Sequence, residues 1–345
     1  MTTVEVNPDI PVEEWQSYVG SHPEGNYYHL PQWQEVIKES LNHRPFYLFA
    51  KNGGGKLCGI LPLFQIRSVL TGRRLISLPF SHTCGPLADS EDTVSLLIER
   101  AKSLCDELSC SYMEIRTMQP LSLGLEVNDH FFAHVLELSE PRLMWQKTLD
   151  RNARWAVGKA RREGVVVKSH DSTEAFEVFH AINLQTKRRL GVPGHHKEFF
   201  MAIRKHMKQY ARLYLAEIQN KFVAGALMIN FNGVAGYAYA GSDSRYLKQC
   251  PNDLLAWQAI EDSYNDGFRS FDLGKTDSAN VGLSHFKEKW GAEPQRLHFH
   301  YYPRAPVLVS SNRSGVKYRL VTSVWKRLPL PLVKVLSPTV FRQLD

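Results

Sequence analysis

Three features that mark secreted or membrane-spanning proteins are missing from this sequence. The first residues, Met1 to Asp9, are polar and acidic, without a basic stretch followed by an apolar run. The longest apolar runs, such as Ala224–Ile229, fall far short of the roughly 20 residues that cross a bilayer. The five cysteines are odd in number and lack paired spacing. We therefore expect free thiols and a cytoplasmic protein.

Signatures of two catalytic classes are also absent. No Gly-x-Ser-x-Gly sequence is present, which argues against a serine hydrolase of the nucleophile-elbow type. The histidine pairs His195-His196 and His298 with His300 have no carboxylate or cysteine at a spacing that would complete three ligands. We therefore expect no metal site.

A pyrophosphate loop for coenzyme A is matched only in part. Its form is Arg/Gln-x-x-Gly-x-Gly/Ala, which leaves backbone N–H groups free to bind phosphate at a helix N-terminus. Gly164 is followed two residues later by Val166, and Gly191 by Pro193. A side chain at that position would crowd the phosphates, so the sequence gives no positive support for coenzyme A.

The positive charge is unevenly distributed. The net charge is +7, yet the segment from Pro306 to Asp345 holds seven basic residues and a single acid. The rest of the chain is nearly neutral, which excludes a general nucleic-acid binder.

The two halves of the chain resemble each other weakly. Residues 47–64 read YLFAKNGGGKLCGILPLF and residues 214–231 read YLAEIQNKFVAGALMINF. Each is an apolar segment, a polar turn and a second apolar segment, which is the pattern of a β-hairpin. Downstream, helix-period segments at 93–108 and 254–266 precede short strands at 111–116 and 270–273.

Helical stretches also open both halves, at 12–18 and 31–39 in the first and at 174–190 and 196–207 in the second. Such alternation predicts an α/β protein of two tandem domains, each with a mixed central sheet flanked by helices. We expect a first domain over 1–140, a second over 141–305 that includes a basic linking helix at 142–163, and a basic amphipathic tail over 306–345.

One stretch carries a family resemblance. Phe271–Pro294, FDLGKTDSANVGLSHFKEKWGAEP, closely resembles the FemAB family of tandem acetyltransferase-fold (GNAT-like) enzymes, which add amino acids to peptidoglycan precursors. LPLPL at Leu328–Leu332 resembles a subgroup found with exopolysaccharide and PEP-CTERM protein-sorting systems. Supporting matches lie at Tyr28–Trp33, Arg151–Gly164, Thr186–Phe200 and Tyr239–Asp243.

The resemblance implies an acyltransferase or aminoacyltransferase that forms an amide on a cell-envelope precursor of the peptidoglycan or exopolysaccharide type. The first half would bind the acceptor, the second the donor, and the substrate would lie in a groove between or beside the halves. The long helical hairpin of some members is absent, so the donor stays open between aminoacyl-tRNA and acyl-CoA. No bound cofactor is expected. The alternatives are an acyl-CoA-dependent N-acyltransferase acting on a polysaccharide amino sugar and a non-catalytic module that binds an envelope precursor.

Acyl transfer to an amine requires oriented substrates, a proton acceptor and stabilisation of an oxyanion. Asp243 and Asp277 follow expected strands and are candidate proton acceptors, although aspartate also favours turns and helix caps. Tyr239, Lys275 and Asn280 are candidate substrate-binding residues in the matched motifs.

Arginines supply further candidates for substrate binding. A helix over 145–162 would place Lys147, Arg151, Arg154 and Arg161 on one face. That face either binds an anionic nucleotide-sugar, lipid pyrophosphate or tRNA, or is the solvated side of a helix packed between domains. Arg188, in the second partial pyrophosphate match, is the other candidate.

Lys287 is the strongest catalytic candidate. In a helix over 281–290, Leu283, Phe286, Lys287 and Trp290 share one face, whereas Lys289 faces solvent. A lysine within an apolar face must be paired or reach a ligand, because an unpaired buried ammonium is costly. The family resemblance places it near the donor phosphate or reacting carbonyl. A structural ion pair with Asp272 or Asp243 is the alternative.

The tail combines apolar and basic residues over 316–328 and 330–340. We expect either peripheral contact with an anionic inner-membrane surface, where lipid-linked precursors reside, or packing against the body of the protein. Pro329, Pro331 and Pro338 are expected to break it into short pieces.

Overall fold

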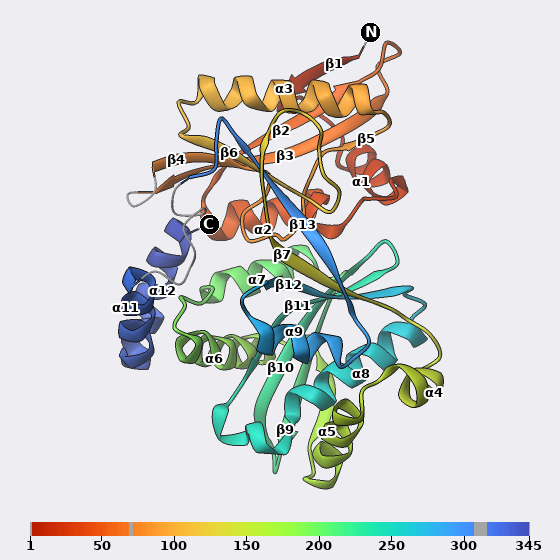
Figure 1. The fold of residues 1–345 in the computed structure, drawn as a ribbon, viewed down its shortest axis with the longest axis vertical. Helices are drawn as coiled ribbons and strands as arrows, with labels where there is room; N and C mark the ends of the chain where they lie inside the picture. Colours follow the sequence, from red (N-terminus) through yellow and green to blue (C-terminus); the bar gives the residue numbers. More distant parts are fainter. Residues whose placement is uncertain (1, 69–71, 307–315, 345) are drawn as a thin grey trace. The chain divides into compact units, whose positions relative to one another are not determined.

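The computed structural model describes residues 2–68, 72–306 and 316–344. The chain forms two compact units (Figure 1). Unit 1 comprises Met1–Phe131, Arg296–Arg313 and Arg342–Asp345, and unit 2 comprises Phe132–Gln295 and Ser314–Phe341. Two of the four crossings, after Phe131 and after Gln295, fall inside strands, whereas the expected boundaries at 140 and 305 lie in the segments that follow those strands.

Unit 1 is a sheet covered by helices. Its strands follow the order β1-β2-β3-β4-β6-β13, with β7 beside β13 and the short β5 beside β3. α3 begins at its cap Ser90, whose side chain accepts the N–H of Thr93. The elements are β1 (Thr3–Val6), α1 (Val12–Ser21), α2 (Pro31–Leu41), β2 (Arg44–Lys51), β3 (Leu57–Ser68), β4 (Gly72–Ile76), β5 (Leu87–Ala88), α3 (Glu91–Glu107), β6 (Tyr112–Thr117), β7 (Glu126–Glu137) and β13 (Glu293–Tyr302).

Unit 2 repeats this plan with the strand order β7-β12-β11-β10-β9-β8. Two hairpin turns have the positive φ angles that right-twisted hairpins need, at Gln219-Asn220 and at Asn232-Gly233. The elements are α4 (Pro141–Leu143), a wide helical turn (Met144–Thr148), α5 (Arg151–Arg162), β8 (Val166–His170), α6 (Thr173–Leu190), α7 (Lys197–His206), β9 (Ala211–Ile218), β10 (Lys221–Phe231), β11 (Val234–Ser242), α8 (Pro251–Asn265), β12 (Ser270–Asp277), α9 (Val281–Glu288), α11 (Val316–Arg327) and α12 (Leu330–Leu344).

The internal repeat is confirmed at the level of topology. In unit 1, β2, β3 and β4 pair antiparallel in turn, and β4 then pairs parallel with β6. In unit 2, β9, β10 and β11 pair antiparallel in turn, and β11 then pairs parallel with β12. The helix before the parallel strand is α3 in one unit and α8 in the other. The predicted hairpins, helices and short strands are all present.

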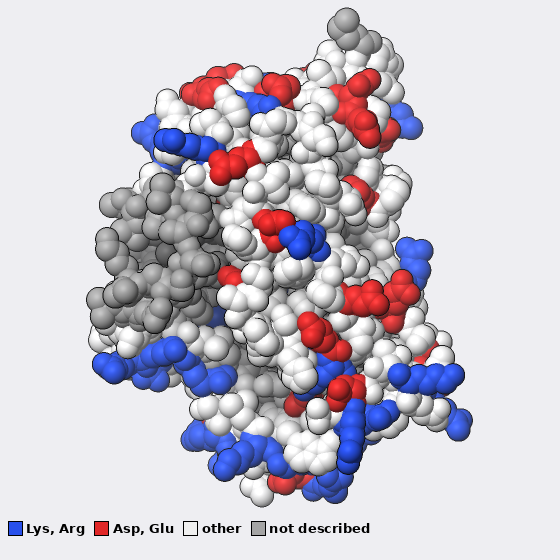
Figure 2. All heavy atoms as spheres, in the orientation of Figure 1, with Lys and Arg blue, Asp and Glu red and all other residues white. Residues whose placement is uncertain are grey.

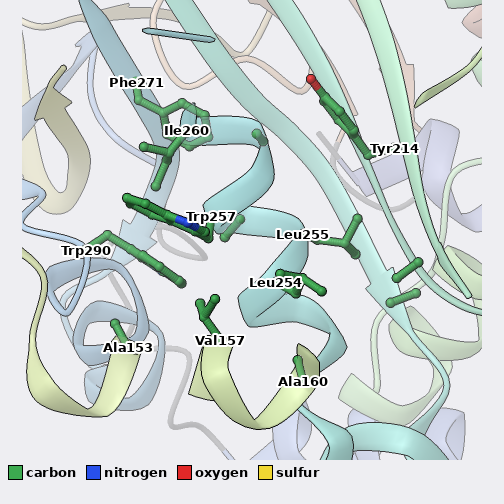
Figure 3. Close-up of a cluster of buried hydrophobic side chains, with 14 of the residues drawn as sticks. Ala153, Val157, Ala160, Tyr214, Leu254, Leu255, Trp257, Ile260, Phe271 and Trp290 are labelled. Carbon is green, nitrogen blue, oxygen red and sulfur yellow. The ribbon is translucent and has the colours of Figure 1, made fainter. Parts of the chain in front are cut away.

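Helices cover both faces of the unit 2 sheet. A Cβ on Gly225 of β10 would meet Phe179 of α6, whereas the neighbouring Ala224 belongs to the core shared with α8. Alternate residues of a strand face opposite sides, so α6 and α8 cover opposite faces. Figure 3 shows the α8 side, where Val157 of α5 packs with Trp257 and with Trp290, the residue that follows α9 closely.

The predicted single helix over 145–162 is wrong. Leu149 is extended, and Asp150 caps a new helix by accepting the N–H of Asn152 over 2.6 Å. Aspartate favours this cap, so the chain starts α5 afresh instead of continuing the preceding turn. Lys147 therefore does not share a helix face with Arg151.

The tail forms two helices that pack on unit 2. Trp325 of α11 and Val333 of α12 are buried against Leu184 of α6. Pro329 separates the helices, but the prediction that Pro331 and Pro338 also break the tail is wrong, because both lie inside α12.

Candidate active site

The neighbouring strands β11 and β12 separate within unit 2. Their parallel register ends at Gly236 opposite Asp272, although β11 continues to Ser242 and β12 to Asp277. Just beyond this point, Leu227 of β10 faces Tyr239 and the next residue faces Tyr237, so β11 bulges between the two tyrosines. The backbone of β11 therefore loses its partner strand on one side and presents N–H groups to the gap, as stabilisation of an oxyanion requires.

The corresponding gap in unit 1 is filled. Parallel pairing of β4 and β6 ends at Ile76 opposite Glu114, and the N–H of Cys84 then binds the carbonyl of Arg116 over 2.9 Å. The guanidinium of Arg116 is 3% exposed and donates to Glu114 over 2.6 Å and to the carbonyl of Ser81 over 2.7 Å. Unit 1 thus closes the position that unit 2 leaves open.

α6 satisfies part of the free backbone of β11. The side-chain amide of Asn183 donates to the carbonyl of Ala240 over 3.0 Å, and Thr186 exchanges two hydrogen bonds with the backbone of Ser242. A Cβ on Gly241 would lie 2.8 Å from the backbone of Asn183. The end of β11 is thereby fixed, and the gap remains between the bulge and β12.

Lys287 lies at the end of this gap. Its side chain is buried, and Nζ donates to the carbonyl oxygens of Gly274 and Lys275 over 2.7 and 3.1 Å. Gly274 has φ +75°, a conformation that favours glycine and turns these carbonyls toward the lysine. Burial lowers the pKa of Lys287 to about 8, against the attraction of Asp272. Two N–H groups are used, and the third is available to a ligand.

Lys287 is held by two backbone carbonyls, and no carboxylate of the described residues forms an ion pair with it. Asp272 accepts the N–H of Gly274 over 2.7 Å, and Asp243 binds Arg245, as described below. The described residues therefore show no structural ion pair between Lys287 and either aspartate.

Two predictions about the α9 face are wrong. Leu283 is 37% exposed and does not belong to the buried face, because α9 is a short helix whose first turn lies at the surface. Lys289 does not face solvent: it forms an ion pair with Asp253 of α8, and its ammonium lies 4.5 Å from the ring centre of Phe286. Buried residues of α9 and its C-terminus are Lys287 and Trp290.

A buried histidine stands beside Lys287. His134 of β7 is 1% exposed, and neither ring nitrogen has a hydrogen-bond partner among the described residues. Its Nε2 lies 3.7 Å from Oε1 of Glu288, the residue after Lys287. Burial lowers the pKa of His134, and the charge of Lys287 lowers it further.

Asp243 is engaged in local structure. It caps the short helical segment Ser244–Gln249 by accepting the N–H of Arg245, and its carboxylate pairs with the guanidinium of Arg245 over 2.6 Å. The hydrogen bond from Arg245 lowers the pKa of Asp243, which weakens it as a proton acceptor.

The predicted residues between β12 and α9 shape a loop. Asp277 accepts the N–H of Ala279 over 3.0 Å, and Asn280 caps α9 by accepting the N–H of Leu283. β12 extends to Asp277, beyond the strand that the sequence predicted over 270–273. Lys275 contributes its backbone carbonyl to the site, where it accepts a hydrogen bond from Lys287.

Tyr239 and Arg188 occupy other parts of unit 2. The ring of Tyr239 packs edge-on against His195 and Phe199, at 4.9 and 5.6 Å between ring centres. Arg188 donates through Nε to the carbonyl of Leu328 over 2.5 Å and so holds the tail against α6. Arg188 is thus a tail anchor in this structure.

The two arginines of α5 that were predicted as substrate-binding residues differ in role. Arg154 donates to the carbonyls of Trp145 and Gln146 and closes the preceding helical turn. Arg151 is exposed. The sequence interpretation missed Trp155, which is 57% exposed and carries the ammonium of Lys159 5.3 Å from its ring centre. Figure 2 shows Lys and Arg side chains gathered at the end of unit 2 where Figure 1 places α5.

Of the nine predicted site residues, Lys287, Lys275, Asp277 and Asn280 lie together around the β12–α9 connection. His134 was missed, since its strand carries no motif; its only sequence signal is a histidine within an alternating segment, EVNDHFFAHVLE. Among the described residues, no three His, Cys, Asp or Glu side chains converge as a metal site would require. In the same ranges, no helix is long and apolar enough to cross a membrane.

Comparison with known families places the recognisable domain in unit 2. Residues 146–288 match the model described as "Acetyltransferase (GNAT) domain". This range contains the open gap, Lys287 and Glu288. No curated protein matches the sequence.

Comparison with solved structures identifies the fold. A crystal structure of FemX is 16% identical with a TM-score of 0.67, covering 85% of this chain and 96% of that chain. L-PGS from Bacillus licheniformis is 15% identical with a TM-score of 0.58, covering 92% and 97%. A tandem GNAT protein from the clavulanic acid biosynthesis pathway is 12% identical with a TM-score of 0.53, covering 88% and 99%. The chain therefore has a tandem GNAT fold. The internal repeat predicted the two tandem α/β halves, and the family resemblance implied their GNAT-like fold.

Proposed function

We propose that unit 2 is an acyltransferase of the FemAB type, which transfers an acyl or aminoacyl group to an amine of a cell-envelope precursor. The observation that carries the proposal is Lys287, whose buried ammonium lies where β11 and β12 separate. Its free N–H and the exposed backbone of β11 together can stabilise the oxyanion formed when an amine attacks an ester carbonyl.

The asymmetry of the two units supports this assignment. In unit 1 the N–H of Cys84 binds the carbonyl of Arg116, so the backbone of β6 already has a partner where β4 and β6 separate. We therefore assign binding of the acceptor to unit 1, which is the role that the family resemblance implies for the first half. The family model covers unit 2 alone, in agreement with this division.

The surroundings of α8 favour an aminoacyl ester over acyl-CoA as donor. A pyrophosphate binds a helix N-terminus through free N–H groups and the positive end of the helix dipole. Here Pro251 lacks an N–H, and the N–H of Asp253 binds the carbonyl of Cys250. The Asp253 carboxylate also carries a negative charge in the first turn, paired with Lys289.

α5 supports an RNA-borne donor. Its exposed face presents Arg151, Trp155, Lys159 and Arg162, which repeat at the spacing of one helix face. Exposed aromatic rings between basic residues bind single-stranded RNA by base stacking and phosphate contacts. α5 also starts at the site, because the N–H of its cap Asp150 binds the carbonyl of Lys289 over 2.9 Å.

The tail supports an acceptor at the membrane surface. α12 packs through Val333 but exposes Leu332 and Val335, at 50% and 72%, beside the exposed Lys334. Apolar side chains next to lysines bind anionic bilayers through the combined effect of burial and charge. The tail thus combines the two alternatives, since one face packs on the protein and the other remains available to a membrane.

A donor assay tests the proposal. Purified full-length protein is incubated with an amine-bearing UDP-linked or lipid-linked envelope precursor and with either aminoacyl-tRNA or acyl-CoA, and products are identified by mass spectrometry. An amide formed only from aminoacyl-tRNA is the expected result. Product from acyl-CoA would establish the N-acyltransferase alternative, and ligand binding without any product would establish a non-catalytic binding module.

A further inference from the structure

Among the described residues, His134 lacks the hydrogen bonds that a buried histidine with a purely structural role usually makes. Leaving buried polar atoms unpaired costs about 1–3 kcal/mol each, so buried histidines usually donate or accept hydrogen bonds. His300, equally buried in unit 1, lies 3.0 Å from the hydroxyl of Thr117. Neither nitrogen of His134 has such a bond among the described residues.

Three charged residues, Glu288, Lys287 and Asp272, lie around the imidazole of His134. Glu288 lies 3.7 Å from Nε2 and is half exposed. Lys287 and Asp272 act on the imidazole from α9 and from β12. A carboxylate next to one ring nitrogen fixes the orientation of the ring and stabilises its protonated form, which makes the other nitrogen a proton acceptor.

We propose that His134 is the general base of the unit 2 site and that Glu288 orients it. The inference rests on the proposed acyl transfer. Nδ1 of His134 accepts the proton of the attacking amine, while the third N–H of Lys287 binds the carbonyl oxygen of the donor ester.

The step is balanced without any further reactant. The amine nitrogen forms a bond to the carbonyl carbon, and His134 takes one proton from that nitrogen. The carbon–oxygen bond of the ester then breaks, and the protonated His134 returns the proton to the leaving sugar hydroxyl. An amide and an alcohol are formed, and His134 is neutral again.

The proposal explains why Asp243 and Asp277 need not act as bases. Asp243 is paired with Arg245, and Asp277 accepts a backbone N–H in a turn. His134 is buried beside Lys287, and its lowered pKa keeps it neutral and able to accept a proton at pH 7.

The test combines kinetics with NMR on the full-length protein. His134→Gln keeps a polar side chain that does not titrate, and Glu288→Gln removes the charge of a half-exposed residue without changing its size. His170→Gln, a half-buried histidine on the edge strand β8, is the matched control. We expect kcat to fall about 100-fold in His134→Gln and about tenfold in Glu288→Gln, with KM nearly unchanged.

Two further readouts separate catalysis from structure. The acidic limb of the pH–kcat profile should be present in the wild type and in His170→Gln and absent in His134→Gln. In NMR titrations, the pKa of His134 should fall in Glu288→Gln and rise in Lys287→Met, because each variant removes one neighbouring charge.

The outcomes are distinguishable from failure of the proposed function. If the wild type transfers acyl groups and both His134→Gln and Glu288→Gln keep full kcat, the general base is elsewhere and the acyltransferase assignment stands. If the wild type transfers nothing, the proposed function fails, and the NMR titrations still decide the pairing. An unchanged pKa of His134 in both charge variants would overturn it.

Discussion

The ammonium of Lys287 donates to the carbonyl oxygen of Gly274 over 2.7 Å, and this contact joins α9 to the end of β12 at the point where the sheet opens. The same residue is buried and has a pKa lowered to about 8. A cation in this position costs stability, and the contact therefore has consequences that depend on pH.

The first prediction concerns the stability of Lys287→Met. The pKa of Lys287 is about 8 in the folded protein and about 10.5 in the unfolded chain, so the unfolded state binds more protons between these values. The unfolding free energy contributed by Lys287 therefore rises as pH rises from 8 to 10.5, by about 3 kcal/mol. Denaturant titrations at pH 7.5 and 10.5 should show the wild type gaining stability relative to Lys287→Met. A difference independent of pH would contradict the burial of the ammonium.

The second prediction concerns the closed gap of unit 1. Arg116→Met leaves the buried Glu114 without its cation, which should cost about 3–5 kcal/mol of stability. Arg100→Met, which removes an exposed ion pair with Glu107, should cost less than about 1 kcal/mol. Thermal unfolding of both variants measures the contrast. Equal small effects would show that the Arg116 pair does not hold unit 1 together.

The third prediction concerns RNA binding at α5. Trp155→Ala should weaken binding of a fluorescent single-stranded RNA about tenfold, because base stacking on one exposed ring contributes about 1–3 kcal/mol. The melting temperature should be unchanged, since Trp155 is 57% exposed. Phe222→Ala, an exposed aromatic residue on the hairpin strand β10, is the control. Equal affinity of wild type and Trp155→Ala would remove α5 from the RNA site.

The fourth prediction concerns the exposed face of the tail. Val335→Glu should reduce co-sedimentation with vesicles of anionic phospholipid several-fold without lowering the melting temperature, because Val335 is 72% exposed. Val166→Glu, an exposed valine on the edge strand β8, should sediment as the wild type does. A point substitution is preferable to truncation, since removal of the tail would uncover the surface that Trp325 and Val333 cover. Equal sedimentation of Val335→Glu and wild type would exclude this face as the membrane contact.

Local sequence patterns predicted the repeated part of the fold and the burial of Lys287. Hairpins, helices and short strands depend on apolar periodicity and on turn residues that lie within a few positions of each other in the sequence. β7 was not predicted as a strand, because its neighbouring strands, β13 and β12, lie far away in the sequence. The position of His134 depends on this distant pairing, so no local pattern could reveal it.

The wrong predictions have equally local causes. The helical periodicity of residues 145–162 indicated one helix, but Asp150 favours a helix cap over a helix interior. Proline was taken to end a helix at Pro338, but packing of the buried Val333 and Phe341 on either side holds α12 together. Periodicity placed Leu283 in the core, yet this residue lies in the first turn of α9 and is 37% exposed. In each case capping or tertiary packing outweighed the pattern.

Amide formation by Lys287→Met with aminoacyl-tRNA and an envelope-precursor amine decides whether Lys287 acts in acyl transfer. Lys221→Met, which changes an exposed lysine in the β9–β10 hairpin, is the matched control. Loss of one hydrogen-bond donor to an oxyanion lowers kcat by about 100- to 1,000-fold. We expect a loss of this size in Lys287→Met and full activity in Lys221→Met, with both proteins folded. Full activity in Lys287→Met would contradict the placement of Lys287 in the active site.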